Sequence, residues 1–177
     1  MTDPVAYLAL VIPWQSFQTL TFKSDVPPAA IRVKMLFKWH RAVAQCAGVH
    51  KSNLMMMAPA ELGEKTGRFH FHPLLAGFRE PPKRPMRFAI MKLWQQSGGG
   101  FARSRLCGNA SEDIGYALKD LPTQAQDEFE TRRLNDGRAS NVIITASCWK
   151  YAAKRRKFSG ERRFSSWVRE IPAFGRG

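Results

Sequence analysis

Two histidines separated by a single residue, His70 and His72, are the clearest candidates for chemistry in this sequence. They lie in the stretch GRFHFHPLLAG, and the whole chain has only four histidines. If this stretch is a β-strand, residues two apart project from the same face, so both imidazoles point the same way. Two imidazoles with one carboxylate form a donor set suited to manganese, zinc, iron or a loosely held magnesium ion. The spacing therefore indicates a divalent metal site.

A neighbouring strand can supply the carboxylate. Glu61 ends an apolar segment just before the turn GEKTGR, and antiparallel pairing across this turn would bring it beside the histidines. Glu64, in the turn itself, is a second choice. A His-x-His pattern also arises by chance in chains of this length, so the motif alone is equally compatible with two structural imidazoles.

Periodicity and the positions of proline and glycine predict the elements that position these residues. Alternating or β-branched apolar runs predict strands over residues 17–22, 53–62 and 69–78, the last two being antiparallel neighbours. Apolar residues at helical spacing predict a helix over 29–48, opened near Pro28 and closed by Gly48.

The remaining elements complete an α+β pattern. We expect a helix over 86–96, a flexible glycine run over 97–100, a strand over 101–108, a helix over 111–121, a helix or ordered linker over 123–137 and a helix over 139–158. The N-terminal apolar stretch, broken by Pro13, is predicted to be core or edge structure and not a signal peptide. The predicted fold is a central antiparallel sheet of about five strands flanked by helices. It forms a single domain over 1–177, with the motifs in 17–121 and a basic, mostly helical extension over 122–177.

The charge balance predicts a polyanionic partner. Lys and Arg number 28 against 14 acidic residues, which gives a formal net charge of +14. Such an excess favours nucleic acid first and anionic membranes second. The positive charge is concentrated after Trp149. The residues predicted to bind DNA there are Lys150, Lys154, Arg155, Arg156, Lys157, Arg162 and Arg163.

The cysteines and the glycine run limit the class of protein. Cys46, Cys107 and Cys148 are too far apart for a disulfide framework or a zinc knuckle, so we expect a reducing compartment, the cytoplasm of the host cell. No run approaches the ~20 apolar residues of a membrane span, and we expect no membrane partner. The glycine run is not a phosphate loop, because Phe101 and Ala102 stand where Lys and Ser or Thr are needed. A helicase, where required, would be supplied by another protein.

Three stretches together resemble the HUH endonuclease superfamily, and in particular the rolling-circle replication initiator (Rep) proteins of small plasmids, phages and viruses. The first is the strand Thr19-Leu20-Thr21-Phe22, the second is His70-Phe71-His72, and the third is the Tyr-x-x-Lys motif at Tyr116-Ala117-Leu118-Lys119. Their order and spacing fit the family, and Glu61 is similar to the extra carboxylate that many members carry. The resemblance covers about residues 17–121 and implies an HUH-type, RRM-like (RNA-recognition-motif-like) arrangement of the sheet and its helices.

The resemblance implies a sequence-specific enzyme that nicks and joins single-stranded DNA at an origin or an origin hairpin. His70, His72 and Glu61 would hold a divalent metal, Mn²⁺ or Mg²⁺, that polarises the scissile phosphate. Tyr116 would attack this phosphate and form a 5′-phosphotyrosine bond, which leaves a 3′-OH for priming. Lys119, one helical turn further on, can sit beside the Tyr116 hydroxyl or the phosphate.

Several alternatives remain open. Tyr151 and Lys154 also form a Tyr-x-x-Lys motif, but their basic surroundings are more typical of a DNA-binding helix, and they lie further from His72 than the family's usual gap. The chain could instead be an HUH transposase or relaxase of a mobile element. It could also be a non-catalytic basic nucleic-acid-binding protein with structural histidines, which predicts salt-sensitive binding without metal uptake or cleavage.

The other histidines and the tryptophans are expected to be structural. We expect His40 on a helix surface and His50 in a loop, neither of them a metal ligand. Trp14, Trp39 and Trp94 are expected in the core. Trp149 and Trp167 are the better candidates for stacking on bases, although core packing is the expected role of each.

Overall fold

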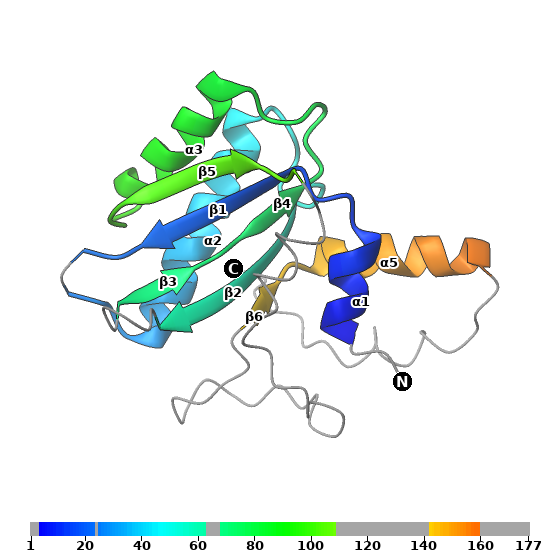
Figure 1. The fold of residues 1–177 in the computed structure, drawn as a ribbon, viewed down its shortest axis with the longest axis horizontal. Helices are drawn as coiled ribbons and strands as arrows, with labels where there is room; N and C mark the ends of the chain where they lie inside the picture. The colour runs from blue at the N-terminus through cyan, green and yellow to red at the C-terminus, as the bar shows by residue number, and fades with distance from the viewer. Residues whose placement is uncertain (1–3, 24, 63–67, 109–141, 160–177) are drawn as a thin grey trace.

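An antiparallel sheet lies at the centre of the protein, and helices pack on both of its faces (Figure 1). The computed structural model describes residues 4–23, 25–62, 68–108 and 142–159. The strands are β1 Ser16–Thr21, β2 Met55–Leu62, β3 Phe69–Phe71, β4 Leu74–Ala76, β5 Ala102–Leu106 and β6 Val142–Ile144. Every strand pairing among the described residues is antiparallel. The fold is therefore α+β with an antiparallel sheet flanked by helices, as the sequence predicts.

The predicted strand over 69–78 is present, but it is divided into β3 and β4 at Pro73. Both pieces lie between β1 and β2, so the order across the sheet is β5, β1, β3 with β4, β2 and β6. Proline has no N–H to give to the ladder. The rest of the local backbone stays paired, because the Gln18 amide donates to the Pro73 carbonyl at 2.8 Å and the His72 amide donates to the Pro59 carbonyl at 2.8 Å.

Four helices are described, namely α1 Pro4–Val11, α2 Ala29–Cys46, α3 Arg84–Gln96 and α5 Ala146–Ser159. The predicted helix is confirmed as α2 with Pro28 at its N-cap, but it ends at Cys46, and Gly48 lies just beyond its C-cap at a φ of 63°. Pro85 similarly occupies the first turn of α3. Proline suits the first turn of a helix because its missing N–H has no partner there.

The helices divide the core into two layers. Leu36 and Trp39 of α2 pack with Trp94 of α3 against one face of the sheet, which we call the core face. Val5 and Leu8 of α1 pack with residues of α5 against one end of the other face. Figure 1 shows α2 behind the sheet, and α1 and α5 together beyond the end of the sheet that is opposite to β3.

Val142–Ile144 forms a strand, so the prediction of one helix over 139–158 is wrong at its start. Ile144 pairs with Met57 of β2, and Thr145 then ends the strand. The Thr145 Oγ1 accepts from the Met56 amide at 2.9 Å, and the Thr145 carbonyl accepts from the Cys148 amide at 3.0 Å. Thr145 thus connects β6 to the first turn of α5.

The glycine run expected to be a flexible spacer has a packing role. A Cβ atom on Gly100 would lie 2.6 Å from the carbonyl oxygen of Phe22, so only glycine fits beside the end of β1. The Gly100 amide donates to the Thr21 carbonyl at 2.9 Å, and the Trp94 indole donates to the same carbonyl at 2.7 Å. These contacts fix where β5 begins relative to β1.

No helix among the described residues combines the length and the apolar character needed to cross a membrane. The predicted helix over 111–121 and the predicted segment over 123–137 lie outside the described residues.

Candidate active site

Glu61, His70 and His72 lie on the face of the sheet opposite to the core face. Glu61 is the direct pairing partner of His70 across β2 and β3, and His70 is also paired with Thr21 of β1. Phe71, between the histidines, points to the core face, where it is only 2% exposed. The strand pairing expected from the sequence is therefore present, and it brings the carboxylate to the side of the sheet that carries the imidazoles.

His72 and Glu61 are in direct contact. The Nε2 atom of His72 lies 3.0 Å from Oε2 of Glu61, and the two side chains are 7% and 12% exposed. The Nδ1 atom of His72 lies 3.5 Å from Oγ1 of Thr19, and its ring stacks on Phe17 with 5.7 Å between centroids. β1 and β2 thus hold this imidazole from both sides.

Glu61 is the only acidic residue in the strands that the structure describes. A carboxylate near the interior of a sheet is unfavourable unless a charge or hydrogen-bond donors compensate it. One compensating group here is the imidazole of His72. Carboxylate and imidazole are both donor groups that divalent cations accept.

His70 completes the cluster but lies further out. Its ring is half-buried, and it stacks beside the ring of His72 with 6.0 Å between centroids and an interplanar angle of 27°. Within residues 4–23, 25–62, 68–108 and 142–159, no group of three or more His, Cys, Asp or Glu side chains is placed to hold a metal ion. The structure thus provides a close pair, Glu61 and His72, with a third donor, His70, on the same face.

The contact between Glu61 and His72 fits a metal site. Two neighbouring donor atoms of an octahedral ion, each about 2.1 Å from the metal, are about 3.0 Å apart. The 3.0 Å between Nε2 of His72 and Oε2 of Glu61 has this value. Glu61 and His72 are therefore the two residues that would hold a metal ion here, and His70 is a third donor on the same face.

An open hollow of about 320 Å³ adjoins the cluster, and its described lining residues are Phe17, Thr19, Arg103 and Arg105. In the pairing of β1 with β5, Thr19 is opposite Arg103 and Phe17 is opposite Arg105. The guanidinium of Arg105 lies 4.5 Å from the centroid of the Phe17 ring. Two exposed arginines are thus placed one strand away from the residues that contact His72. We call the surface formed by Phe17, Thr19, Thr21, Glu61, His70, His72, Arg103 and Arg105 the site face.

Arg103 and Arg105 are not among the site residues predicted from the sequence. A signal was present, because the two arginines alternate with Ala102 and Ser104 in a predicted strand and must share one face. The sequence does not predict the order of the strands in the sheet. This order places β5 beside β1 and so brings the two arginines to the site face.

The structure places the other predicted site residues as follows. Tyr116, Lys119, Arg162 and Arg163 lie outside the described residues. Arg156 and Lys157 belong to α5, but their side chains are not described. Lys150, Lys154 and Arg155 are exposed on α5. Figure 1 shows α5 at the opposite end of the sheet from β3, which carries His70, so these cations are not part of the site face.

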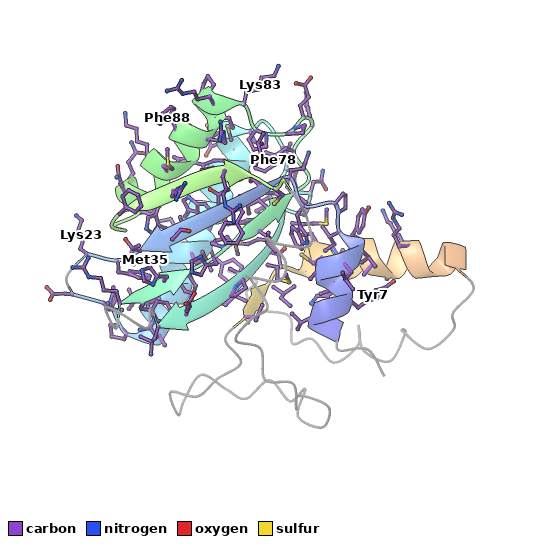
Figure 2. The ribbon with its side chains drawn as sticks, viewed as in Figure 1. Tyr7, Lys23, Met35, Phe78, Lys83 and Phe88 are labelled. Atoms are coloured by element: carbon purple, nitrogen blue, oxygen red, sulfur yellow. The ribbon has the colours of Figure 1, made fainter. Side chains whose placement is uncertain are left out.

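The rival tyrosine, Tyr151, has a packing role. Its ring is half-buried against the core that α1 and α5 share, and its hydroxyl accepts from the Arg155 Nε at 3.3 Å. Tyr7 of α1 packs in the same cluster. Figure 2 shows Tyr7 far from Lys23, which follows the end of β1 where Thr21 pairs with His70.

His40 is buried, so its predicted position on a helix surface is wrong. It is 4% exposed, and its Nε2 atom lies 2.9 Å from the Leu54 carbonyl oxygen. Burial lowers the pKa of His40, and the nearby Arg41 acts in the same direction, while the Leu54 carbonyl opposes them. His50 is exposed, as expected, and its Nδ1 lies 2.6 Å from the Ser52 Oγ.

The tryptophans expected in the core are there, and Trp149 is also buried, at 8% exposed. Trp149 is therefore a core residue, and Trp167 lies outside the described residues. Burial raises the pKa of the Cys148 thiol to about 11, so this thiol stays protonated at neutral pH.

No family model, no curated protein and no solved structure matches this chain. The geometry of the site face and the sequence motifs are therefore what points to a function.

Proposed function

We propose that this protein is a metal-dependent enzyme that nicks and joins single-stranded DNA, with the HUH endonuclease type of fold. The observation that carries the proposal is the 3.0 Å contact of His72 with Glu61, beside His70 on the same sheet face. The order of the elements supports the finer assignment of the fold. The chain runs β1, α2, β2, β3 with β4, α3 and β5, and in the sheet β1 lies between β5 and the pieces β3 and β4, which is the strand order of an RRM-like sheet.

His72, Glu61 and His70 are the residues that would hold the divalent ion, Mn²⁺ or Mg²⁺. When bound, the ion supplies Lewis-acid polarisation of a phosphate oxygen. The protein's contribution is to hold the ligands. Thr19 and Phe17 fix the plane of the His72 ring, and β-pairing with Thr21 fixes the backbone of His70. Ligands held in this way by their surroundings bind with less loss of side-chain freedom.

Tyr116 is the proposed nucleophile. The chain has three tyrosines, and Tyr7 and Tyr151 both pack in the core beside α1 and α5, away from β3. The Tyr116 oxygen would form a bond to phosphorus while the bond from phosphorus to the 3′ oxygen breaks, and that oxygen takes up a proton as it leaves. Lys119 would favour the phenolate form of Tyr116. Joining is the reverse reaction, with a 3′-OH as the attacking group.

The proposed biological role is initiation of rolling-circle DNA replication, with the helicase supplied by another protein. The net charge of +14 supports a nucleic-acid substrate.

A covalent-adduct assay tests the proposal. The wild-type protein, incubated with Mn²⁺ and a labelled single strand that carries its origin, is expected to give a protein–DNA adduct that survives denaturing electrophoresis. Tyr116→Phe should abolish the adduct, because the phenol oxygen is the attacking atom. Tyr151→Phe is the matched control and should keep it. An adduct that survives Tyr116→Phe and disappears in Tyr151→Phe would reassign the nucleophile.

One observation favours a second candidate, a basic nucleic-acid-binding protein with structural histidines. His72 is nearly buried and has Glu61, Thr19 and Phe17 as neighbours, which is also how a core histidine is satisfied. This candidate predicts salt-sensitive DNA binding, no metal uptake and no adduct. Calorimetric titration of Mn²⁺ into the wild type and into His70→Ala/His72→Ala separates the two candidates.

A further inference from the structure

We propose that β5 is the binding strand for the DNA that flanks the reactive phosphate, with Arg103 and Arg105 holding backbone phosphates and Phe101 stacking on a base. This inference rests on the proposed function, because it takes the position of the reactive phosphate from Glu61, His70 and His72. It assigns a binding role to residues that no sequence motif singled out.

Arg103 and Arg105 are separated from His72 by one strand, β1. Thr19 and Phe17 of β1 contact His72, and their pairing partners on β5 are Arg103 and Arg105. Neighbouring strands lie about 4.8 Å apart, so β5 runs roughly 10 Å from β3. A single strand whose phosphate is held at the histidines would cover that distance with one or two nucleotides. Arg103 and Arg105 are both exposed, and both line the hollow beside the cluster.

The spacing of the two arginines along β5 suits the backbone of a single strand. Residues two apart in a strand lie about 6.8 Å from each other on the same face. This is comparable with one nucleotide step of an extended single strand, so the two guanidinium groups can bind consecutive phosphates. Arg105 is also fixed over the Phe17 ring at 4.5 Å, which restricts its side chain before DNA arrives.

An exposed aromatic residue, Phe101, lies just before β5. Phe101 is 66% exposed, although it is a large apolar side chain. Its carbonyl accepts from both the amide and the hydroxyl of Thr21, each at 2.9 Å, so its backbone is fixed beside β1. Ala102 points to the core face, and alternation therefore places Phe101 on the site face. Thr21 is paired with His70, so Phe101, Thr21, His70 and Glu61 follow one another across the sheet.

Single-strand binding surfaces combine cations that follow the backbone with aromatic rings that stack on bases. Arg103 and Arg105 on β5 and Phe101 just before it supply both parts. α5 carries more cations, but it lies at the opposite end of the sheet from His70.

Binding in the absence of metal tests this inference. The probe is a fluorescein-labelled single-stranded oligo(dT) in EDTA, and anisotropy gives the affinity at several NaCl concentrations. Arg103→Ala/Arg105→Ala should lose at least tenfold in affinity at low salt. The slope of log affinity against log salt should fall by roughly 1.4, about 0.7 for each phosphate that the variant no longer neutralises. Arg103→Lys/Arg105→Lys should keep most of the slope, which separates loss of charge from misfolding.

The matched control removes the same charge elsewhere. Arg79 lies in the loop between β4 and α3, and Lys92 lies on α3, and both are exposed. Arg79→Ala/Lys92→Ala should stay within about threefold of the wild type, because neither residue contacts the proposed path. An equal loss in this control would overturn the inference and indicate binding by overall charge.

Phe101 is tested separately. Phe101→Ala should weaken binding roughly tenfold with an unchanged salt slope, and Phe101→Trp should restore it, because stacking needs an aromatic face. Wild-type affinity in Phe101→Ala would remove this residue from the inference.

The two proposals fail in different ways. Loss of affinity in Arg103→Ala/Arg105→Ala without any covalent adduct in the wild type would support the binding strand and overturn the enzyme. An adduct formed by a protein whose β5 variants bind as the wild type does would support the enzyme and overturn the binding strand.

Discussion

The two faces of the sheet bury different kinds of side chain. The core face is apolar along β1, β3 and β4, where Leu20, Phe71 and Leu75 pack beneath α2 and α3. The opposite face, which includes the site face, is apolar at the end covered by α1 and α5, and its other described residues include histidines, threonines, arginines and one glutamate. Both faces come from the same strands. Strand alternation thus lets three consecutive residues, His70, Phe71 and His72, contribute to stability and to a candidate site at once.

This contrast is also visible in the histidines. His40 is buried beneath the core side of the sheet with a backbone carbonyl as its partner, whereas His72 is buried against a carboxylate. A neutral imidazole suffices for the first environment. The second environment contains a charge, so it can attract a cation.

The largest expected change in the free energy of unfolding comes from substitution of Phe71, and its neighbour His70 gives the comparison. Phe71→Ala should lower the free energy of unfolding by about 3–5 kcal/mol, because it empties a fully packed position on the core face. His70→Ala, measured by urea unfolding in EDTA, should lower it by less than about 1 kcal/mol. Phe71→Leu gives an intermediate, still folded variant. A similar loss in His70→Ala and Phe71→Ala would show that the site face is also a packing face.

The next effect is stabilisation by metal. At 100 times its dissociation constant, Mn²⁺ should raise the free energy of unfolding of the wild type by about 2.7 kcal/mol. The increase should be larger at higher pH, because imidazole must be deprotonated to bind a metal. His72→Ala and Glu61→Gln should not respond to Mn²⁺, while His50→Ala, at an exposed histidine, should respond as the wild type does. A full response in His72→Ala would exclude this cluster as the metal site.

The smallest effect is the pH dependence that comes from His40. Burial lowers its pKa, so the unfolded chain takes up this proton before the folded protein does. Stability from this group is therefore present above the ordinary histidine pKa of about 6.5 and is lost as the pH falls below it. Unfolding measured between pH 7 and pH 5 should show a slope of up to about 1.4 kcal/mol per pH unit from this group.

His40→Gln should remove that part of the slope, since glutamine can still donate to the Leu54 carbonyl but does not titrate. His50→Gln should leave the slope unchanged, because His50 is exposed. An unchanged slope in His40→Gln would mean that the acid sensitivity comes from other groups, with the pair of His72 and Glu61 as the first to test.

Much of the fold could be predicted because its signals are local. Alternation in FQTLTF predicts β1, and the helical spacing of Leu36, Trp39 and Val43 predicts α2, with Gly48 just beyond its C-cap. The turn predicted from GEKTGR indicates that β2 and β3 are antiparallel neighbours, and their pairing places Glu61 opposite His70.

The errors arose where the deciding contact is distant in sequence. Val142–Ile144 is a short apolar run next to a helical pattern, and only its pairing with Met57–Pro59 of β2 makes it a strand. His40 looked like a surface residue, and only the carbonyl of Leu54 makes a buried position possible for it. Gly100 looked like part of a spacer, and only the nearby backbone of Phe22 explains why glycine is needed there.

The sequence alone determines the alternation of side chains along each strand. It therefore predicts that His70 and His72 share a face and that Arg103 and Arg105 share a face. These follow from strand geometry, which is local and needs no partner. Only the packing of the folded chain places the histidine pair and the arginine pair on the same face of the sheet. It depends on β1 lying between β3 and β5, which non-local pairing sets through the burial of Leu20 and Phe71 beneath α2 and α3. A burial pattern of period two can orient each strand, but it cannot order the strands in a sheet.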